Sequence, residues 1–125
     1  MKGFATFVLA ALVMAGGAVY AAAPVTVEGT LVDSVCYLHN GAMTNDHGGM
    51  KDCGTMCLKN GAPAAVVTKD KQLHVIIAPS TALADYVGQE IRVTGEENGN
   101  AILATKAEVK GMDGKWTAVK LGSSM

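Results

Sequence analysis

Apolar and polar residues alternate along several short segments of this chain, which is the pattern of half-buried β-strands. Gly29 interrupts the first segment and is expected to mark a bend or a bulge there. Turn residues at 69–71 and at 96–100 are expected to join two pairs of these strands as hairpins. The predicted strands lie at 25–35, 64–68, 72–78, 89–95, 101–109 and 115–120, the last as an edge strand.

One short helix is expected between the third and fourth strands. Ser80 or Thr81 can cap it, Leu83 and Val87 fall on one face, and Gly88 ends it. The resulting order of three strands, a helix and two strands is that of a five-stranded Greek-key barrel, the OB-fold. The fold class predicted is therefore all-β with one short helix, in an OB-fold-like barrel. A generic β-sandwich or meander fits the same pattern.

A Cys/His-rich insertion follows the first strand at residues 36–63 and lacks strand-like alternation. Loops of this length inside a small domain are usually functional or disordered. In an OB-fold, the loop after the first strand lies at the rim of the binding face. Function is therefore expected in this insertion.

The N-terminal residues 1–23 have the three parts of a secretory signal peptide: Lys2, a short apolar run and an alanine-rich end. The apolar run is shorter than the ~20 residues that span a bilayer. Cleavage near Ala21 to Ala23 would leave residues 24–125 as a single OB-like domain. We expect this domain to be periplasmic or secreted, with no membrane attachment after cleavage.

The overall charge gives no sign of a nucleic-acid partner. Ten basic residues stand against eleven acidic ones, for a net charge of −1, and loss of Lys2 would make the charge more negative. Phosphate-backbone binding depends on clusters of Lys and Arg, and single-strand binding depends on aromatic platforms as well. The mature chain has neither. No serine–histidine–acid pattern or phosphate-binding loop is present, so we expect no enzymatic activity.

All three cysteines of the chain fall in the segment CYLHNGAMTNDHGGMKDCGTMC, residues 36–57, with two of the three histidines. An odd number of cysteines in an exported protein calls for an explanation. Leu58 follows Cys57, so the C-x-x-C-H haem-attachment motif is absent and no haem is expected. The spacing also differs from that of a thioredoxin-type pair. The third histidine, His74, is expected on the surface of a strand.

The cysteines and histidines of this segment predict a metal site. Cys36, His47, Cys53 and Cys57 form a Cys3His set, the type of shell that holds zinc or copper. His39 is an alternative or fifth ligand. Residues 53 and 57 are four apart, so both sulfur atoms would project from one face of a helical turn.

The methionines of the segment bear on the choice of metal. Met50 and Met56, with Met43, place soft thioether groups near the cysteines, and such groups favour Cu(I). Copper is therefore expected slightly ahead of zinc, for metal buffering, delivery or sensing. The expected partners are the metal ion and another exported protein that exchanges it.

Two other interpretations of the cysteines stay open. Two of them can form a disulfide that staples the loop of a structural or partner-binding module, with Cys36 the easier partner. They can also exchange thiols and disulfides with a redox partner, which requires a thiol of low pKa.

Two resemblances accompany this interpretation. A cysteine pair separated by three residues, with a histidine elsewhere, is similar in ligand type and spacing to the copper sites of exported copper-delivery proteins that serve cytochrome oxidase. The thioredoxin-like fold of those proteins does not match the strand order here. The run of Cys-Tyr-Leu, a Gly/His spacer, Cys-x-x-x-Cys and Gly-Ala-Pro resembles small exported OB-fold-like bacterial proteins of unassigned function, over residues 28–109. That resemblance implies the fold and the compartment only.

Overall fold

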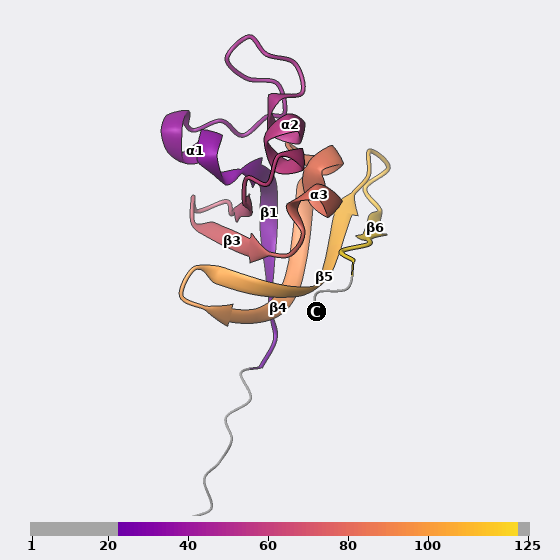
Figure 1. Cartoon of the computed structure of the whole chain (residues 1–125). Helices are drawn as coiled ribbons and strands as arrows, with labels where there is room; N and C mark the ends of the chain where they lie inside the picture. Colours follow the sequence, from indigo (N-terminus) through magenta and orange to yellow (C-terminus); the bar gives the residue numbers. More distant parts are fainter. Residues whose placement is uncertain (1–22, 123–125) are drawn as a thin grey trace, which may run out of the picture.

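The computed structural model describes residues 23–122, and its elements form a β-sheet with short helices at one end (Figure 1). The predicted signal peptide lies outside the described residues, except for Ala23. The predicted all-β class is confirmed. The elements are β1 Val25–Asp33, α1 Ser34–Asn40, α2 Cys53–Lys59, β2 Ala64–Val67, β3 Leu73–Ile77, α3 Ser80–Leu83, η1 Ala84–Tyr86, β4 Glu90–Asn98, β5 Ala101–Lys110 and β6 Trp116–Val119.

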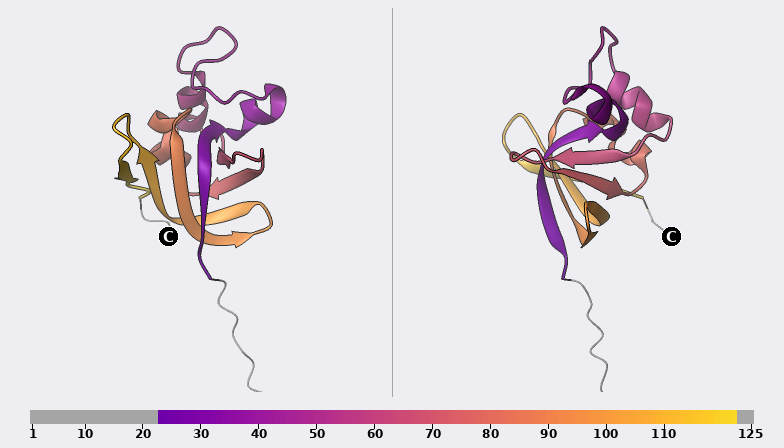
Figure 2. Two further views of the ribbon diagram at one scale, coloured as in Figure 1. Left: turned by 180° about the vertical axis from the view of Figure 1, so that it is seen from behind. Right: turned by 90° about the vertical axis from the view of Figure 1, so that its left-hand side faces the viewer.

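The strands pair in the order β3-β2-β1-β4-β5-β6, and these neighbours are antiparallel. A further, parallel pairing joins β3 to β5 through Val75↔Ala101, Ile76↔Ile102 and Ile77↔Leu103. The first five strands are therefore linked in a closed circuit, and β6 extends the sheet beyond β5. The two views of Figure 2 show the strands curving around a common interior.

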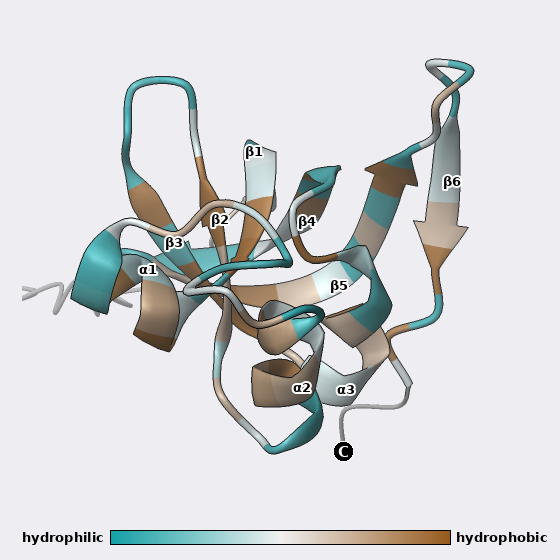
Figure 3. Ribbon diagram, turned by 90° about the horizontal axis from the view of Figure 1, so that it is seen from above, coloured by the Kyte–Doolittle hydropathy of each residue, from teal (hydrophilic) through white to brown (hydrophobic). Residues whose placement is uncertain are grey.

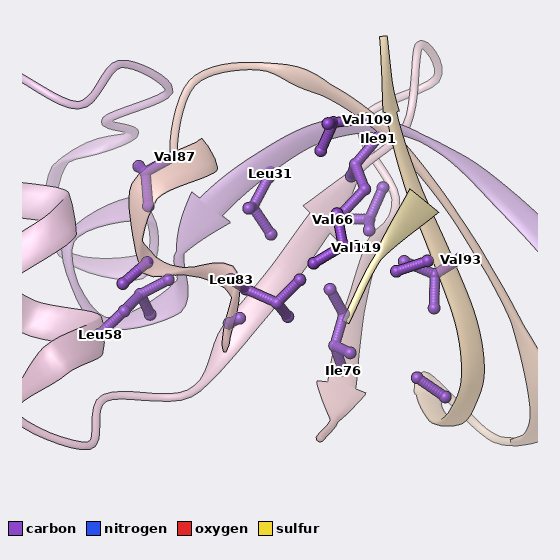
Figure 4. Close-up of a cluster of buried hydrophobic side chains, with 14 of the residues drawn as sticks. Leu31, Leu58, Val66, Ile76, Leu83, Val87, Ile91, Val93, Val109 and Val119 are labelled. Atoms are coloured by element: carbon purple, nitrogen blue, oxygen red, sulfur yellow. The ribbon is translucent and has the colours of Figure 1, made fainter. Parts of the chain in front are cut away.

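The main hydrophobic core fills this interior. Strand residues such as Leu31, Ile91 and Val93 are fully buried, as the alternation predicted for β4. One end of the core is closed by Leu58, from α2, and by Leu83 and Val87, from the segment 80–87 that contains α3 and η1 and is called the α3 region below (Figure 4). Because Leu58 belongs to the insertion, the insertion is packed onto the sheet and is part of the folded unit.

Gly29 stands where β1 changes partners, pairing with β4 up to Thr30 and with β2 from Thr30 onward. A Cβ atom at Gly29 would lie 2.2 Å from the carbonyl oxygen of Val67. The glycine is therefore required by a close approach of two backbones. Of the bend or bulge expected at Gly29, the pairings of β1 show no bulge, and the register irregularity of the sheet lies in β4, between Thr94 and Gly95.

A second apolar cluster lies on the outer face of β1 and β2. Val32, Ala65 and Val67 are buried there, beneath Tyr37, Met43 and Leu73. Tyr37 comes from α1 and Met43 from the segment after it, so this cluster fixes the first half of the insertion to the sheet.

Two expectations about helices and loops are wrong. The insertion contains two helices, so the prediction of one short helix for the whole chain fails. The insertion also begins at Ser34 instead of Cys36. Its two ends are joined by a hydrogen bond of 3.1 Å from the Ser34 N–H to the Pro63 carbonyl. Since α1 and α2 each have only seven residues, neither gives a long helical period to detect.

The surface position expected for His74, on β3, is also wrong. His74 pairs with the inward-facing Val66, and the buried residue of the strand is Ile76. The His74 side chain is 19% exposed and its Nδ1 lies 2.7 Å from Glu97 Oε1. Leu73 faces the outer cluster instead. The prediction failed because both faces of β3 bear apolar residues, and a shift of one residue exchanges the two faces.

Trp116 lies on the edge strand β6, as expected, with the Arg92 guanidinium 4.4 Å from its ring centroid. Within residues 23–122, the helices are all too short or too polar to cross a membrane.

Candidate metal centre

The candidate site begins at the end of β1, where Asp33 caps α1. Its Oδ1 atom accepts a hydrogen bond of 2.9 Å from the Val35 N–H, the usual arrangement at a helix N-terminus. Gly41, in the left-handed conformation, ends the helix and donates its N–H to the Tyr37 carbonyl. These two caps place Cys36 in the first turn of α1, three residues after the end of β1 at Asp33.

Asp33 is itself almost completely buried, at 2% exposure. Its Oδ2 atom has no hydrogen-bond partner among the described residues. An unpaired buried acceptor typically costs a protein about 1–3 kcal/mol, and more when it is charged. A neighbouring thiol, a water molecule or a bound cation can satisfy such an atom.

The second half of the site is α2, and the polar loop before it holds its N-terminus. The Asn45 carbonyl accepts from the Gly54 N–H at 3.0 Å, and Asn45 Oδ1 accepts from the Thr55 N–H at 2.8 Å. Asp46 Oδ1 accepts from the Asp52 N–H at 2.7 Å. These bonds satisfy donors that a helix start leaves unpaired. They also fix Cys53, in the first turn of α2, relative to the loop.

Packing on the other side of α2 is equally close. Gly54 is buried, and a Cβ atom there would lie 2.6 Å from Val87 Cγ1. Thr55 Oγ1 donates to the Ala84 carbonyl at 2.8 Å. The helical turn expected for Cys53 and Cys57 is present, and these contacts hold it against α3 and η1.

His47 stands on a small hairpin within the loop. Its backbone N–H and carbonyl both pair with Met50, at 3.2 and 3.1 Å. Gly48 and Gly49 form the turn, with φ of 61° and 77°, values that favour glycine. The two glycines thus reverse the chain directly after His47.

These elements bring the potential metal ligands of the insertion close to one another. The Sγ atoms of Cys36, Cys53 and Cys57 lie within 4.8 Å of one another. A second group joins a carboxylate oxygen of Asp33, the Cys36 sulfur and a ring nitrogen of His47 within the same distance. Cys36 belongs to both groups. Figures 1 and 3 show α1 and α2 at the same end of the sheet.

The remaining predicted ligands lie apart from these groups. His39 is exposed on the last turn of α1 and belongs to neither group found within residues 23–122. Met50 and Met56 are 55% and 51% exposed. Met43 packs into the outer apolar cluster, where Lys71 Nζ approaches its sulfur at 3.8 Å.

The three cysteines are free thiols of intermediate exposure. The Asp33 carboxylate, toward which the protonated thiol can donate, is the largest cause that raises the pKa of Cys36 to about 12; burial and negative charge add to it. Burial, followed by Asp33, raises the pKa of Cys57 to about 11. Without a cation, both thiols therefore stay protonated at neutral pH. A metal ion would have to displace their protons.

Asp33 is the residue that the sequence interpretation missed. Its place before Ser34 and Val35 gives the signal of a helix cap, and this signal points to α1. Its burial beside Cys36 arises only from the packing of the insertion over the end of β1.

Comparison with known proteins found no family model, curated protein or solved structure that matches this chain. Function is therefore inferred from the geometry of the site.

Proposed function

We propose that this protein is an exported metal-binding protein, which holds a soft or borderline transition-metal ion through Cys36, Cys53 and Cys57. The observation that carries the proposal is the convergence of all three sulfur atoms within 4.8 Å, from two helices of one insertion. Thiolates in such a group are ligands for Cu(I) and for zinc. Copper stands slightly ahead, since three soft sulfur donors suit Cu(I).

The fold proposed for the domain is an OB-like barrel. Three features support it: the meander β1-β2-β3, the parallel pairing of β3 with β5, and the antiparallel pairing of β4 with β1. The α3 region joins the third and fourth strands, and the insertion follows the first strand, at the rim used for binding in OB-folds.

Asp33 supports a cation over a simple disulfide. One disulfide among three cysteines leaves one thiol over, and it brings no positive charge to the buried carboxylate of Asp33. A cation would neutralise the thiolates and the carboxylate together. The raised pKa of Cys36 and Cys57 also disfavours the interpretation as a redox partner, because reactive thiols have a lowered pKa.

The packing of the insertion favours a role in buffering, delivery or sensing. Asn45, Asp46 and Thr55 hold α2 by hydrogen bonds, and Leu58 anchors it in the core. Loss of the metal would therefore leave the domain folded. The partly exposed thiols are open to exchange with solvent or with another exported protein. The predicted signal peptide places this exchange outside the cytoplasm.

Metal analysis of the protein purified from the exported fraction tests the proposal. We expect close to one copper or zinc per chain, or tight uptake of Cu(I) by the reduced protein. Cys53→Ser is expected to abolish the uptake of Cu(I), whereas His39→Gln, the matched control on α1, is expected to retain it. Substoichiometric copper and zinc, together with no tight uptake by reduced protein, would overturn the proposal.

A further inference from the structure

The two groups of potential ligands are not one shell. In a tetrahedral zinc–thiolate site, with Zn–S distances of about 2.3 Å, ligand atoms lie about 3.8 Å apart, and each ligand neighbours all the others. Here His47 is grouped with Cys36 and Asp33, and Cys53 and Cys57 form a separate group with Cys36. Cys36 is the one residue that both groups contain.

We propose that the site has two ion positions that share Cys36 as a bridging ligand. The thiolate position consists of Cys36, Cys53 and Cys57 and takes Cu(I). The mixed position consists of Asp33, Cys36 and His47 and takes a borderline divalent ion of the zinc class. This inference rests on the metal-binding function proposed above and adds a second ion to it.

Asp33 is the first reason to assign an ion to the mixed position. The residue is 2% exposed, and its Oδ2 has no partner within the described part of the chain. A buried carboxylate in this state is normally paired with a cation or a hydrogen-bond donor. Its Oδ1 is already used at the cap of α1, so the carboxylate is held in place before any ion arrives.

The second reason is the set of donor atoms. One carboxylate oxygen, one thiolate and one neutral imidazole supply two negative charges, which match a divalent ion. Oxygen and nitrogen donors also make this position harder than the position formed by three sulfurs, so the two positions differ in the metals that they prefer.

The third reason is access. His47 lines a surface hollow together with Asp46, Gly49, Met50 and Lys51. An ion held by three protein ligands needs a fourth, and in open zinc sites this is water. Because His47 borders this hollow, its side of the mixed position is open to solvent, from which such a water could come. The thiolate position needs no such water, because Cu(I) is satisfied by a small number of sulfur ligands.

A sequential titration tests the proposal. Reduced, metal-free protein receives Cu(I) first and then Co²⁺, which replaces zinc as a coloured probe. We expect one Cu(I) to bind, followed by one Co²⁺ with the visible bands of a tetrahedral site. Circular dichroism of each variant establishes that it is folded.

The variants separate the two positions. His47→Gln is expected to lose the Co²⁺ and keep the Cu(I), and Asp33→Asn is expected to do the same. Cys53→Ser is expected to lose the Cu(I) and keep the Co²⁺, while His39→Gln keeps both. His47 lies on an exposed hairpin, so its substitution keeps the test decisive even if Asp33→Asn does not fold.

Two results would overturn the second position. One is a wild-type protein that binds a single ion under every loading condition. The other is a parallel loss of both ions in His47→Gln, which would indicate one shared shell. Failure of the proposed function gives a different result, because the wild type would then bind neither Cu(I) nor Co²⁺.

Discussion

Asp33 caps helix α1 with one carboxylate oxygen, and a carboxylate oxygen of the same side chain lies within 4.8 Å of the Cys36 sulfur. The residue thus fixes the position of a cysteine and also controls its protonation. Because the carboxylate is buried and its Oδ2 is unpaired, its negative charge acts on the thiol with little screening by solvent.

Asp33→Asn is expected to make Cys36 more reactive. Asparagine caps a helix about as well as aspartate, so α1 should stay in place. The substitution removes the carboxylate that accepts a hydrogen bond from the Cys36 thiol, the largest cause of the raised pKa, and it removes the negative charge as well, so this pKa falls from about 12 toward its ordinary value of 9.0. The alkylation rate of the metal-free protein near neutral pH follows the thiolate fraction and should rise by about tenfold or more.

Peptide mapping after partial alkylation identifies the thiol that has changed. Cys57 should respond less than Cys36, because burial is the largest cause of its raised pKa. Equal rates at Cys36 in the wild type and in Asp33→Asn would contradict the role assigned to the carboxylate.

The stability of the metal-free, reduced protein is expected to fall in alkaline solution. The folded chain raises the pKa of Cys36 to about 12 and that of Cys57 to about 11, so it retains protons that the unfolded chain releases above about 9.0. This contribution to stability is complete below pH 9.0 and is lost as pH rises through the folded-state values. Urea unfolding at about pH 8 and about pH 10.5 measures the effect.

Lysines also titrate in this range, so the comparison needs a variant with the same lysines. The double variant Cys36→Ser, Cys57→Ser should lose less stability between the two pH values than the wild type does. An equal loss in the two proteins would show that the thiols do not contribute.

Asn45→Ala is expected to loosen the start of α2. Asn45 Oδ1 accepts from the Thr55 N–H at 2.8 Å, and the substitution leaves this donor without its partner. We expect a loss of about 1–2 kcal/mol in the free energy of unfolding. Metal affinity should fall by about tenfold, as for other residues that orient ligands. Competition with a chelator measures this affinity.

Asn40→Ala is the matched control for this prediction. Asn40 Oδ1 accepts a similar hydrogen bond from the Ala42 N–H, at 3.0 Å, in an exposed position outside both groups of ligands. It should leave the metal affinity unchanged. If the two variants weakened metal binding equally, the loop network would have no special role in positioning Cys53.

Gly29→Ala is expected to destabilise the sheet without touching the metal site. The new Cβ would lie 2.2 Å from the Val67 carbonyl oxygen, a backbone atom that cannot move away alone. We expect a loss of about 3 kcal/mol, near the upper end for overpacking. Glu28→Ala, at an exposed neighbouring position, should change stability by no more than about 0.5 kcal/mol. Thermal unfolding of the two variants measures the difference.

The strands of this protein were predictable from alternation, because residues such as Ile91 and Val93 face one interior and their neighbours face solvent. Helix α1 was not recognised. Its caps, Asp33 and Gly41, are both visible in the sequence, but Val35 and Leu38 remain exposed, so no apolar face marks the helix.

The candidate site was predictable in its residue types and not in its grouping. The clustering of Cys36, Cys53 and Cys57 along the chain already indicated a shared site. The inclusion of Asp33, and the grouping of His47 with it, depend on how β1, α1 and the His47 hairpin meet in space. No local pattern in the sequence predicts how these three elements pack against one another.

A count of free thiols, in denaturant without reductant and with or without a chelator, tests the central claim most directly. The protein is isolated from the exported fraction for this purpose. Metal binding by Cys36, Cys53 and Cys57 predicts three thiols that react fully only after the metal is removed. A single reactive thiol, unchanged by the chelator, would indicate a disulfide and contradict the account.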